Sequence, residues 1–479
     1  YQSTDYEAAF MEGLAEQRAE IDAIVANPDA PTFDNTIAAL ERSGKKLAKV
    51  SGVFYNLNET DADDVMRETE KKLSPILTEH SAYMTMNEAL FSRVKALYDT
   101  KASLGLTREQ EMVLDKYYRM FVKGGALLDA EKKAQLMEID KQLSLASIEF
   151  GENALAETNA FELVITDEKD LAGLPQSSIN AAREAAQAAG KEGWLFTLHK
   201  PSWIPFLQYA DNRELRKQMY LGYINRGDNN NENDNKAVIA RILKLRQQKA
   251  QLFGYETFAQ YQLEDKMAKT PEAAYNLLMT IWNAALPKAK AEAAELQKMM
   301  DAEGKGEKLE AWDWWYYTEK LREAKYALSE SELRPYFSLE GVRKGAFMVS
   351  EKLFGMKFQP IEGLDVYHPE VETFEVLDAD GSHLALFYTD YFPRATKRAG
   401  AWMNNIVDAS NIDGENQRPI IVNVGNFTRP TADTPSLLTI DETRTLFHEL
   451  GHALHGFLTQ THYPTVSGTS VARDFVELP

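Results

Sequence analysis

Thr439-Ile440-Asp441-Glu442 stands one helical turn before Leu446-Phe447-His448-Glu449-Leu450-Gly451-His452. Thr439 and Glu442 have the spacing of a capping box, in which each side chain accepts a hydrogen bond from the other residue's backbone, and this spacing predicts the start of a helix. The apolar residues that follow at helical spacing support the same helix. We therefore expect one helix that presents His448 and His452, four residues apart, on a single face.

The sequence from His448 to His452 is an H-E-x-x-H motif, which indicates a zinc-dependent hydrolase. Both imidazoles can bind one cation, whereas Glu449 is turned by about 100° around the helix axis and borders the metal without binding it. Zinc lowers the pKa of a bound water toward neutrality and polarises a carbonyl group. We expect Glu449 to accept a proton from that water and to pass one to the leaving amine, so the predicted reaction is amide hydrolysis.

A third zinc ligand is needed, because catalytic zinc usually has three protein ligands and a water. The only acidic residues after the motif are Asp474 and Glu477. From the spacing alone, either can be the ligand, and the other can accept a hydrogen bond from a ligand imidazole. His455 is a rival ligand, but two helical turns do not focus three rings on one ion easily, so we favour a role for His455 in lining the cleft.

The composition excludes several other kinds of site. The 479 residues include no cysteine, 53 basic and 73 acidic side chains, with a net charge of −20. Disulfides, thiolate metal sites and cysteine nucleophiles are therefore excluded. The negative charge argues against a nucleic acid or an anionic membrane as a partner, and no apolar run approaches the roughly 18–20 residues of a membrane helix. Residues 1–30 show no signal-peptide pattern, so we expect a cytoplasmic protein, with the periplasm as the alternative.

The spacing of apolar residues predicts a mainly α protein with a small, late sheet. We divide it into an N-terminal helical region (1–150), a helical lobe with short strands (151–310) and a catalytic region (311–479). A long helix is expected at 129–153. Strands are expected at 161–165, 194–198, 373–377, 383–388 and 420–424, and a hairpin turn at 378–381.

The segment from His448 to His455, together with Ser467-Gly468-Thr469-Ser470 and Asp474-Phe475-Val476-Glu477, resembles the M3 metallopeptidases, the thimet oligopeptidase and neurolysin group. It resembles in particular the bacterial peptidyl-dipeptidases of that family. The resemblance extends over essentially the whole chain. Supporting stretches lie at 27–33, 267–274, 312–314, 333–337, 366–369, 384–388 and 400–403.

The resemblance implies that His448, His452 and Glu477 bind one zinc ion and that Glu449 is the general base. It also implies a mainly α, two-lobed helical ellipsoid of the neurolysin-like, zincin type, with a deep substrate channel and a small sheet near the zinc. Such a channel admits short unstructured peptides. A strand edge in it pairs with the peptide backbone, and we expect that strand to consist of His383, Leu384, Ala385, Leu386, Phe387 and Tyr388.

The predicted activity is the release of C-terminal dipeptides from short oligopeptides. One alternative is an oligopeptidase that cleaves internal bonds by the same chemistry. An alternative of another class is a non-catalytic helical scaffold that binds peptides. Family members continue well beyond Pro479, so groups that stabilise the oxyanion are expected on a further segment or on a second chain.

Overall fold

Helices form most of the computed structural model, which describes residues 2–304, 306–414 and 416–478. The outer limits of the predicted regions, Tyr1 and Pro479, lie outside the described residues. The mainly α fold with a small sheet is as predicted. No helix in the described part of the chain combines the length and the apolarity that a bilayer crossing requires. The α-helices are α1 (Tyr6–Ala26), α2 (Ala39–Arg42), α3 (Lys45–Thr60), α4 (Asp64–Thr85), α5 (Glu88–Asp99), α6 (Arg108–Lys123), α7 (Ala130–Ala160), α8 (Gln176–Ala188), α9 (Lys200–Tyr209), α10 (Arg213–Ile224), α11 (Lys236–Leu252), α12 (Phe258–Leu263), α13 (Pro271–Ala302), α14 (Trp314–Tyr326), α15 (Glu330–Leu333), α16 (Leu339–Phe354), α17 (Ile440–Phe457) and α18 (Arg473–Val476).

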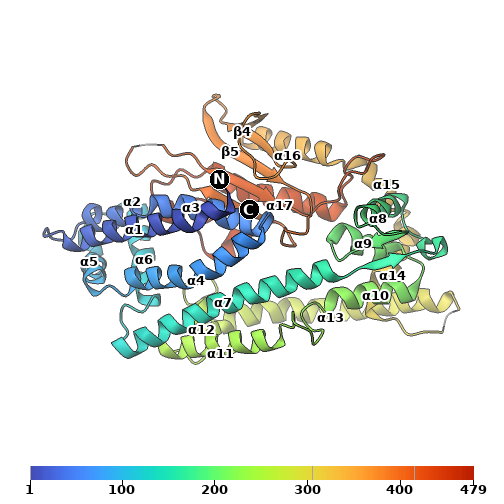
Figure 1. Ribbon diagram of the computed structural model, residues 1–479, viewed down its shortest axis with the longest axis horizontal. Helices are drawn as coiled ribbons and strands as arrows, with labels where there is room; N and C mark the ends of the chain where they lie inside the picture. Colours follow the sequence, from blue (N-terminus) through green and yellow to red (C-terminus); the bar gives the residue numbers. More distant parts are fainter. Residues whose placement is uncertain (1, 305, 415, 479) are drawn as a thin grey trace.

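The long helices α7 and α13 run along one side of the molecule, and α16, α17 and the larger sheet lie on the other (Figure 1). Helix α7 begins after Asp129, whose carboxylate accepts a hydrogen bond from the backbone N–H of Lys132 (2.9 Å). This is the expected N-cap arrangement. The helix then continues to Ala160, seven residues beyond the predicted end at 153, because neither glycine nor proline interrupts it between Glu152 and Ala160.

The larger sheet contains five strands in the order β3-β4-β5-β7-β6. The predicted hairpin is present: β4 and β5 are antiparallel, and Gly381 in their turn adopts φ of 86°, which glycine tolerates. Strand β7 is parallel to β5 and antiparallel to β6. The strands are β3 (Lys357–Pro360), β4 (Glu372–Leu377), β5 (His383–Asp390), β6 (Trp402–Val407) and β7 (Ile420–Val424), with β1 (Leu163–Ile165) and β2 (Trp194–Phe196) forming a separate antiparallel pair.

Strands β3 and β6 were not predicted, and both lie at edges of the sheet. Strand β3 ends with Pro360, which has no backbone N–H to donate. An edge strand tolerates proline because one of its two sides has no partner strand. In β6, Asn404 and Asn405 interrupt the apolar pattern, and the Asn404 side chain donates a hydrogen bond to Asn56 on α3 (3.1 Å). Because these polar residues face a neighbouring helix, β6 lacks the apolar alternation by which a strand is recognised in a sequence.

Helix α17 packs on the sheet through one hydrophobic core. Phe387 of β5 is fully buried, and its ring lies edge-on to Phe457 of α17, with 5.3 Å between the ring centroids. Leu446, Leu450 and Ala453 of α17 belong to the same core. The apolar side of α17 is therefore fixed on the sheet.

We expect Phe387→Ala to lower the free energy of unfolding by about 3–5 kcal/mol, because it removes a fully buried ring from a packed core. Urea denaturation followed by circular dichroism measures the change. Phe354→Ala is the matched control, since Phe354 at the end of α16 is 46% exposed, and we expect a change of about 0.5 kcal/mol or less. Equal losses in the two variants would contradict the assignment of this core.

Candidate metal centre

The start of α17 is fixed by the predicted capping box. Thr439 Oγ1 accepts a hydrogen bond from the Glu442 backbone N–H (3.0 Å), and Glu442 Oε2 accepts one from the Thr439 backbone N–H (2.8 Å). Glu442 also accepts a hydrogen bond from the Thr428 backbone N–H (2.7 Å). Because the helix begins at a fixed residue and packs on the sheet, the directions of His448 and His452 are fixed as well.

Three potential metal ligands converge beside α17. The Nε2 atoms of His448 and His452 are 3.2 Å apart, and Glu477 Oε2 lies 3.2 Å from the first and 3.5 Å from the second. Ligand atoms around a tetrahedral zinc ion are separated by about 3.4 Å, given metal–ligand distances near 2.1 Å. The three residues therefore fit a zinc ion, and within the described ranges they form the only group of this kind.

The ligand group is accessible from outside. The side chains of His448 and Glu477 are 42% and 66% exposed, whereas that of His452 is 11% exposed. Burial lowers the pKa of His452, and the neighbouring His448 ring acts in the same direction. A lowered pKa favours the neutral imidazole that can bind a metal.

Glu449 lies on α17 next to the ligand group but does not belong to it. Its side chain is buried, and this burial raises the pKa of Glu449 to about 7, with a further contribution from the negative charge of Glu477. A carboxyl group whose pKa is close to neutrality can both accept and donate a proton at physiological pH.

The structure separates the two carboxylates that the spacing left open. Asp474 does not contact the imidazoles. Its carboxylate accepts hydrogen bonds from the backbone N–H groups of Met267 (3.0 Å) and Ala268 (2.9 Å), between α12 and α13. His455 also lies outside the ligand group, and its Nδ1 is buried without a hydrogen-bond partner among the described residues.

The prediction that residues 383–388 form a substrate-binding edge strand is wrong, because β5 lies inside the sheet. From Leu386 onward, β5 pairs with β4 on one side and β7 on the other, and the carbonyl of His383 accepts a hydrogen bond from Arg418 (3.2 Å). Leu384, Ala385 and Phe387 are buried in the core, Leu386 and Tyr388 are half-buried, and the His383 ring faces Glu375. A strand in the interior of a sheet has no free backbone groups for an added peptide.

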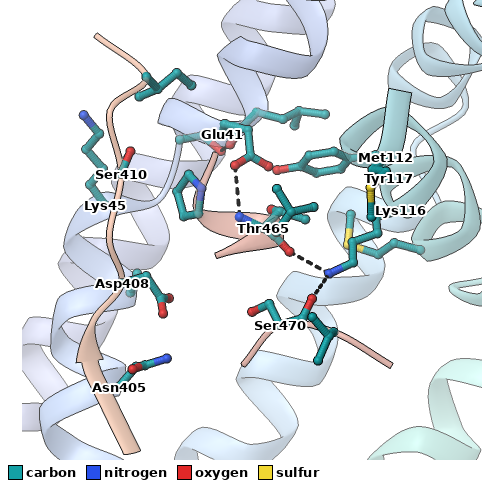
Figure 2. Close-up of a pocket in the computed structure, with 18 of the residues that line it drawn as sticks. Glu41, Lys45, Met112, Lys116, Tyr117, Asn405, Asp408, Ser410, Thr465 and Ser470 are labelled. Atoms are coloured by element: carbon teal, nitrogen blue, oxygen red, sulfur yellow. Dashed lines mark hydrogen bonds between the residues drawn. The ribbon is translucent and has the colours of Figure 1, made fainter. Parts of the chain in front are cut away.

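The sequence also gave no sign of a large cavity beside the chain segment that leads to Glu477. This cavity, of about 1040 Å³, lies between α3, α6, β6 and residues 464–472. Figure 2 shows Lys116 of α6 on one side of it, directed toward Thr465 and Ser470. Only the amphipathic pattern of α6 is visible in the sequence, and that pattern does not identify the partner of its polar face.

Comparison with known proteins places the H-E-x-x-H helix in a family. The model of "Peptidase family M3" matches residues 206–479, more than half of the chain. The chain belongs to peptidase family M3. The M3 family consists of metallopeptidases, so this protein is a metallopeptidase and family membership implies a metal cofactor.

Several M3 relatives are similar over nearly the whole chain. Dipeptidyl carboxypeptidase of Escherichia coli (strain K12) is 38% identical over 476 residues, which cover 99% of this chain and 70% of the relative. Oligopeptidase A of Salmonella typhimurium (strain LT2) is 35% identical over 477 residues, covering 98% and 70%. An organellar oligopeptidase A of Arabidopsis thaliana is 34% identical over 465 residues, covering 94% and 58%.

Proposed function

We propose that this chain is a zinc-dependent peptidase that releases C-terminal dipeptides from short oligopeptides. The convergence of His448, His452 and Glu477 next to the buried Glu449 is the observation on which this proposal depends. The proposed zinc ligands are those three residues. When bound, zinc polarises the scissile carbonyl and acidifies a water molecule.

The proposed role of Glu449 is proton transfer. Its carboxylate accepts a proton from the attacking water, and the carboxylic acid then donates a proton to the nitrogen of the leaving amine. Burial supports this role, because it brings the pKa of Glu449 to about 7. Near neutral pH, both the carboxylate that accepts a proton and the carboxylic acid that donates one are then populated. The ligand histidines cannot take this role, since their Nε2 atoms face the metal position.

The proposed substrates are short, unstructured peptides. The exposure of His448 and Glu477 supports access of a substrate from solvent to the proposed metal position. Similarity to the dipeptidyl carboxypeptidase of E. coli supports release of dipeptides from the C-terminus. Internal cleavage is the second candidate, because the similarity to oligopeptidase A is only slightly lower, 35% against 38% identity.

A pair of peptides that differ only at the C-terminus distinguishes these two candidates. An enzyme that releases dipeptides depends on the free carboxylate, so we expect hydrolysis of the free acid and little hydrolysis of the C-terminal amide. Mass spectrometry of the products measures both rates and identifies the bond that is cleaved. Equal rates with the amide and the acid would favour internal cleavage.

A further inference from the structure

Glu477 is brought to α17 by a segment that the helices of the N-terminal region hold in place. This segment, Leu458–Ala472, leaves α17 at its C-terminal end and leads to α18, directly before Glu477. Within it, regular structure is limited to one 3-10 turn, Pro464–Val466. The position of the proposed third ligand therefore depends on what this segment contacts, together with the hydrogen bonds of Asp474 to Met267 and Ala268.

Helix α6 binds the segment at two places. Near the start of α6, Glu109 accepts hydrogen bonds from the backbone N–H groups of His462 (2.6 Å) and Tyr463 (3.1 Å). Two turns later, the Lys116 ammonium donates to the carbonyl oxygens of Thr465 (2.8 Å) and Ser470. Hydrogen bonds with one charged partner are stronger than neutral ones, so Lys116 joins both halves of the segment to one helix.

Two further contacts support the same attachment. Glu41 of α2, which is 6% exposed, accepts a hydrogen bond from the Thr465 backbone N–H (3.2 Å). The Tyr463 ring packs edge-on to Phe33 at 5.5 Å and extends the core of the N-terminal helices. Figure 2 shows Glu41 and Lys116 on either side of Thr465, each with a hydrogen bond to its backbone.

The segment also passes very close to α17. Gly468 has φ of 50°, and a Cβ atom added to it would lie 3.2 Å from the Gly456 Cα. The two backbones can approach this closely because Gly456 and Gly468 both lack a side chain. Hydrogen bonds from α2 and α6 thus hold the segment on one side, while α17 limits its position on the other.

We propose that Lys116 is a positioning residue for the metal centre: it acts through the segment Leu458–Ala472 on the carboxylate of Glu477. This inference rests on the proposed function, because it requires Glu477 to bind the metal. It assigns part of the metal affinity to α6, whose residues lie more than 300 positions before the proposed ligands. Groups that hydrogen-bond directly to a metal ligand typically contribute about 10–100-fold to metal affinity, and Lys116 acts one step further away, so we expect its effect at the lower end of this range.

A double-mutant cycle on the full chain tests the proposal, with zinc affinity measured by competition with a chromogenic chelator. We expect Lys116→Met to weaken zinc binding by about 10-fold. In a Glu477→Ala background, the same Lys116→Met change has no further effect, because the carboxylate through which Lys116 acts is gone. Glu109→Ala is a second variant with the same two expectations, which keeps the test valid if Lys116→Met does not fold.

Lys101→Met is the matched control. It removes an ammonium that binds Asp115 on α6 and does not contact the segment, so zinc affinity should stay at the wild-type value. Wild-type affinity in folded Lys116→Met overturns the proposal, as does wild-type affinity in Glu109→Ala if Lys116→Met does not fold, and so does an equal loss with and without Glu477. If Glu477→Ala itself binds zinc as tightly as the wild type, the metal centre is misassigned and the proposed function fails with it.

Discussion

Glu449→Gln is expected to reduce peptide hydrolysis by about 10²–10⁴-fold, the contribution that a positioned general acid–base group makes. The amide has nearly the same shape as the carboxyl group but cannot accept the proton of the attacking water. Since Glu449 is not one of the three converging residues, we expect the variant to keep its zinc. Steady-state hydrolysis of a short peptide, measured together with the zinc content of the same sample, provides the check.

Asp441→Asn is the control for this change. Asp441 lies in the first turn of the same helix, and its carboxylate binds Lys200 at the surface (2.6 Å). We expect this variant to hydrolyse the peptide as the wild type does. Full activity of Glu449→Gln would contradict the proposed mechanism and would favour another proton acceptor.

His452→Ala is expected to abolish both zinc binding and hydrolysis. Of the three proposed ligands, His452 is the least exposed, and its loss leaves one imidazole and one carboxylate to bind the ion. We therefore expect zinc affinity to fall by more than the roughly 10–100-fold that a change outside the ligand set costs. Chelator competition measures the affinity, and removal of zinc from the wild type should reproduce the loss of hydrolysis until zinc is restored.

His455→Ala provides a matched comparison on the same helix, three residues further on. The structure leaves His455 outside the ligand group, so we expect the variant to retain one zinc ion per chain. Loss of zinc from His455→Ala, with zinc retained in His452→Ala, would exchange the roles of the two histidines and refute the proposed ligand set.

The local features of the metal centre could be predicted because helix geometry determines them. The capping box at Thr439 and the four-residue spacing of the histidines are properties of one short segment, and both appear as expected. The choice between Asp474 and Glu477 could not be made from spacing. Asp474 binds two backbone N–H groups more than 200 residues earlier, and no local pattern encodes that partner.

The same distinction applies to the sheet. The position of β5 in the sequence was predicted from its alternating pattern, but its place in the sheet depends on β7, which pairs with it in parallel after an intervening strand. Period-two alternation identifies a strand without naming its neighbours. The substrate-binding edge was inferred from the resemblance to the M3 family, and the alternation of β5 could not show that this strand lies inside the sheet.

The attachment of residues 458–472 to α2 and α6 makes the metal centre a long-range feature of the chain. The hydrogen bond between Glu109 and Tyr463 closes a loop of 354 residues. Contacts of such separation carry a large entropy cost of loop closure, which the folded structure must overcome. Helix α17 can align His448 and His452 by itself, but Glu477 must wait for the first and last quarters of the chain to meet. We therefore expect tight metal binding to require attachment of residues 458–472, because only then does Glu477 join the two histidines.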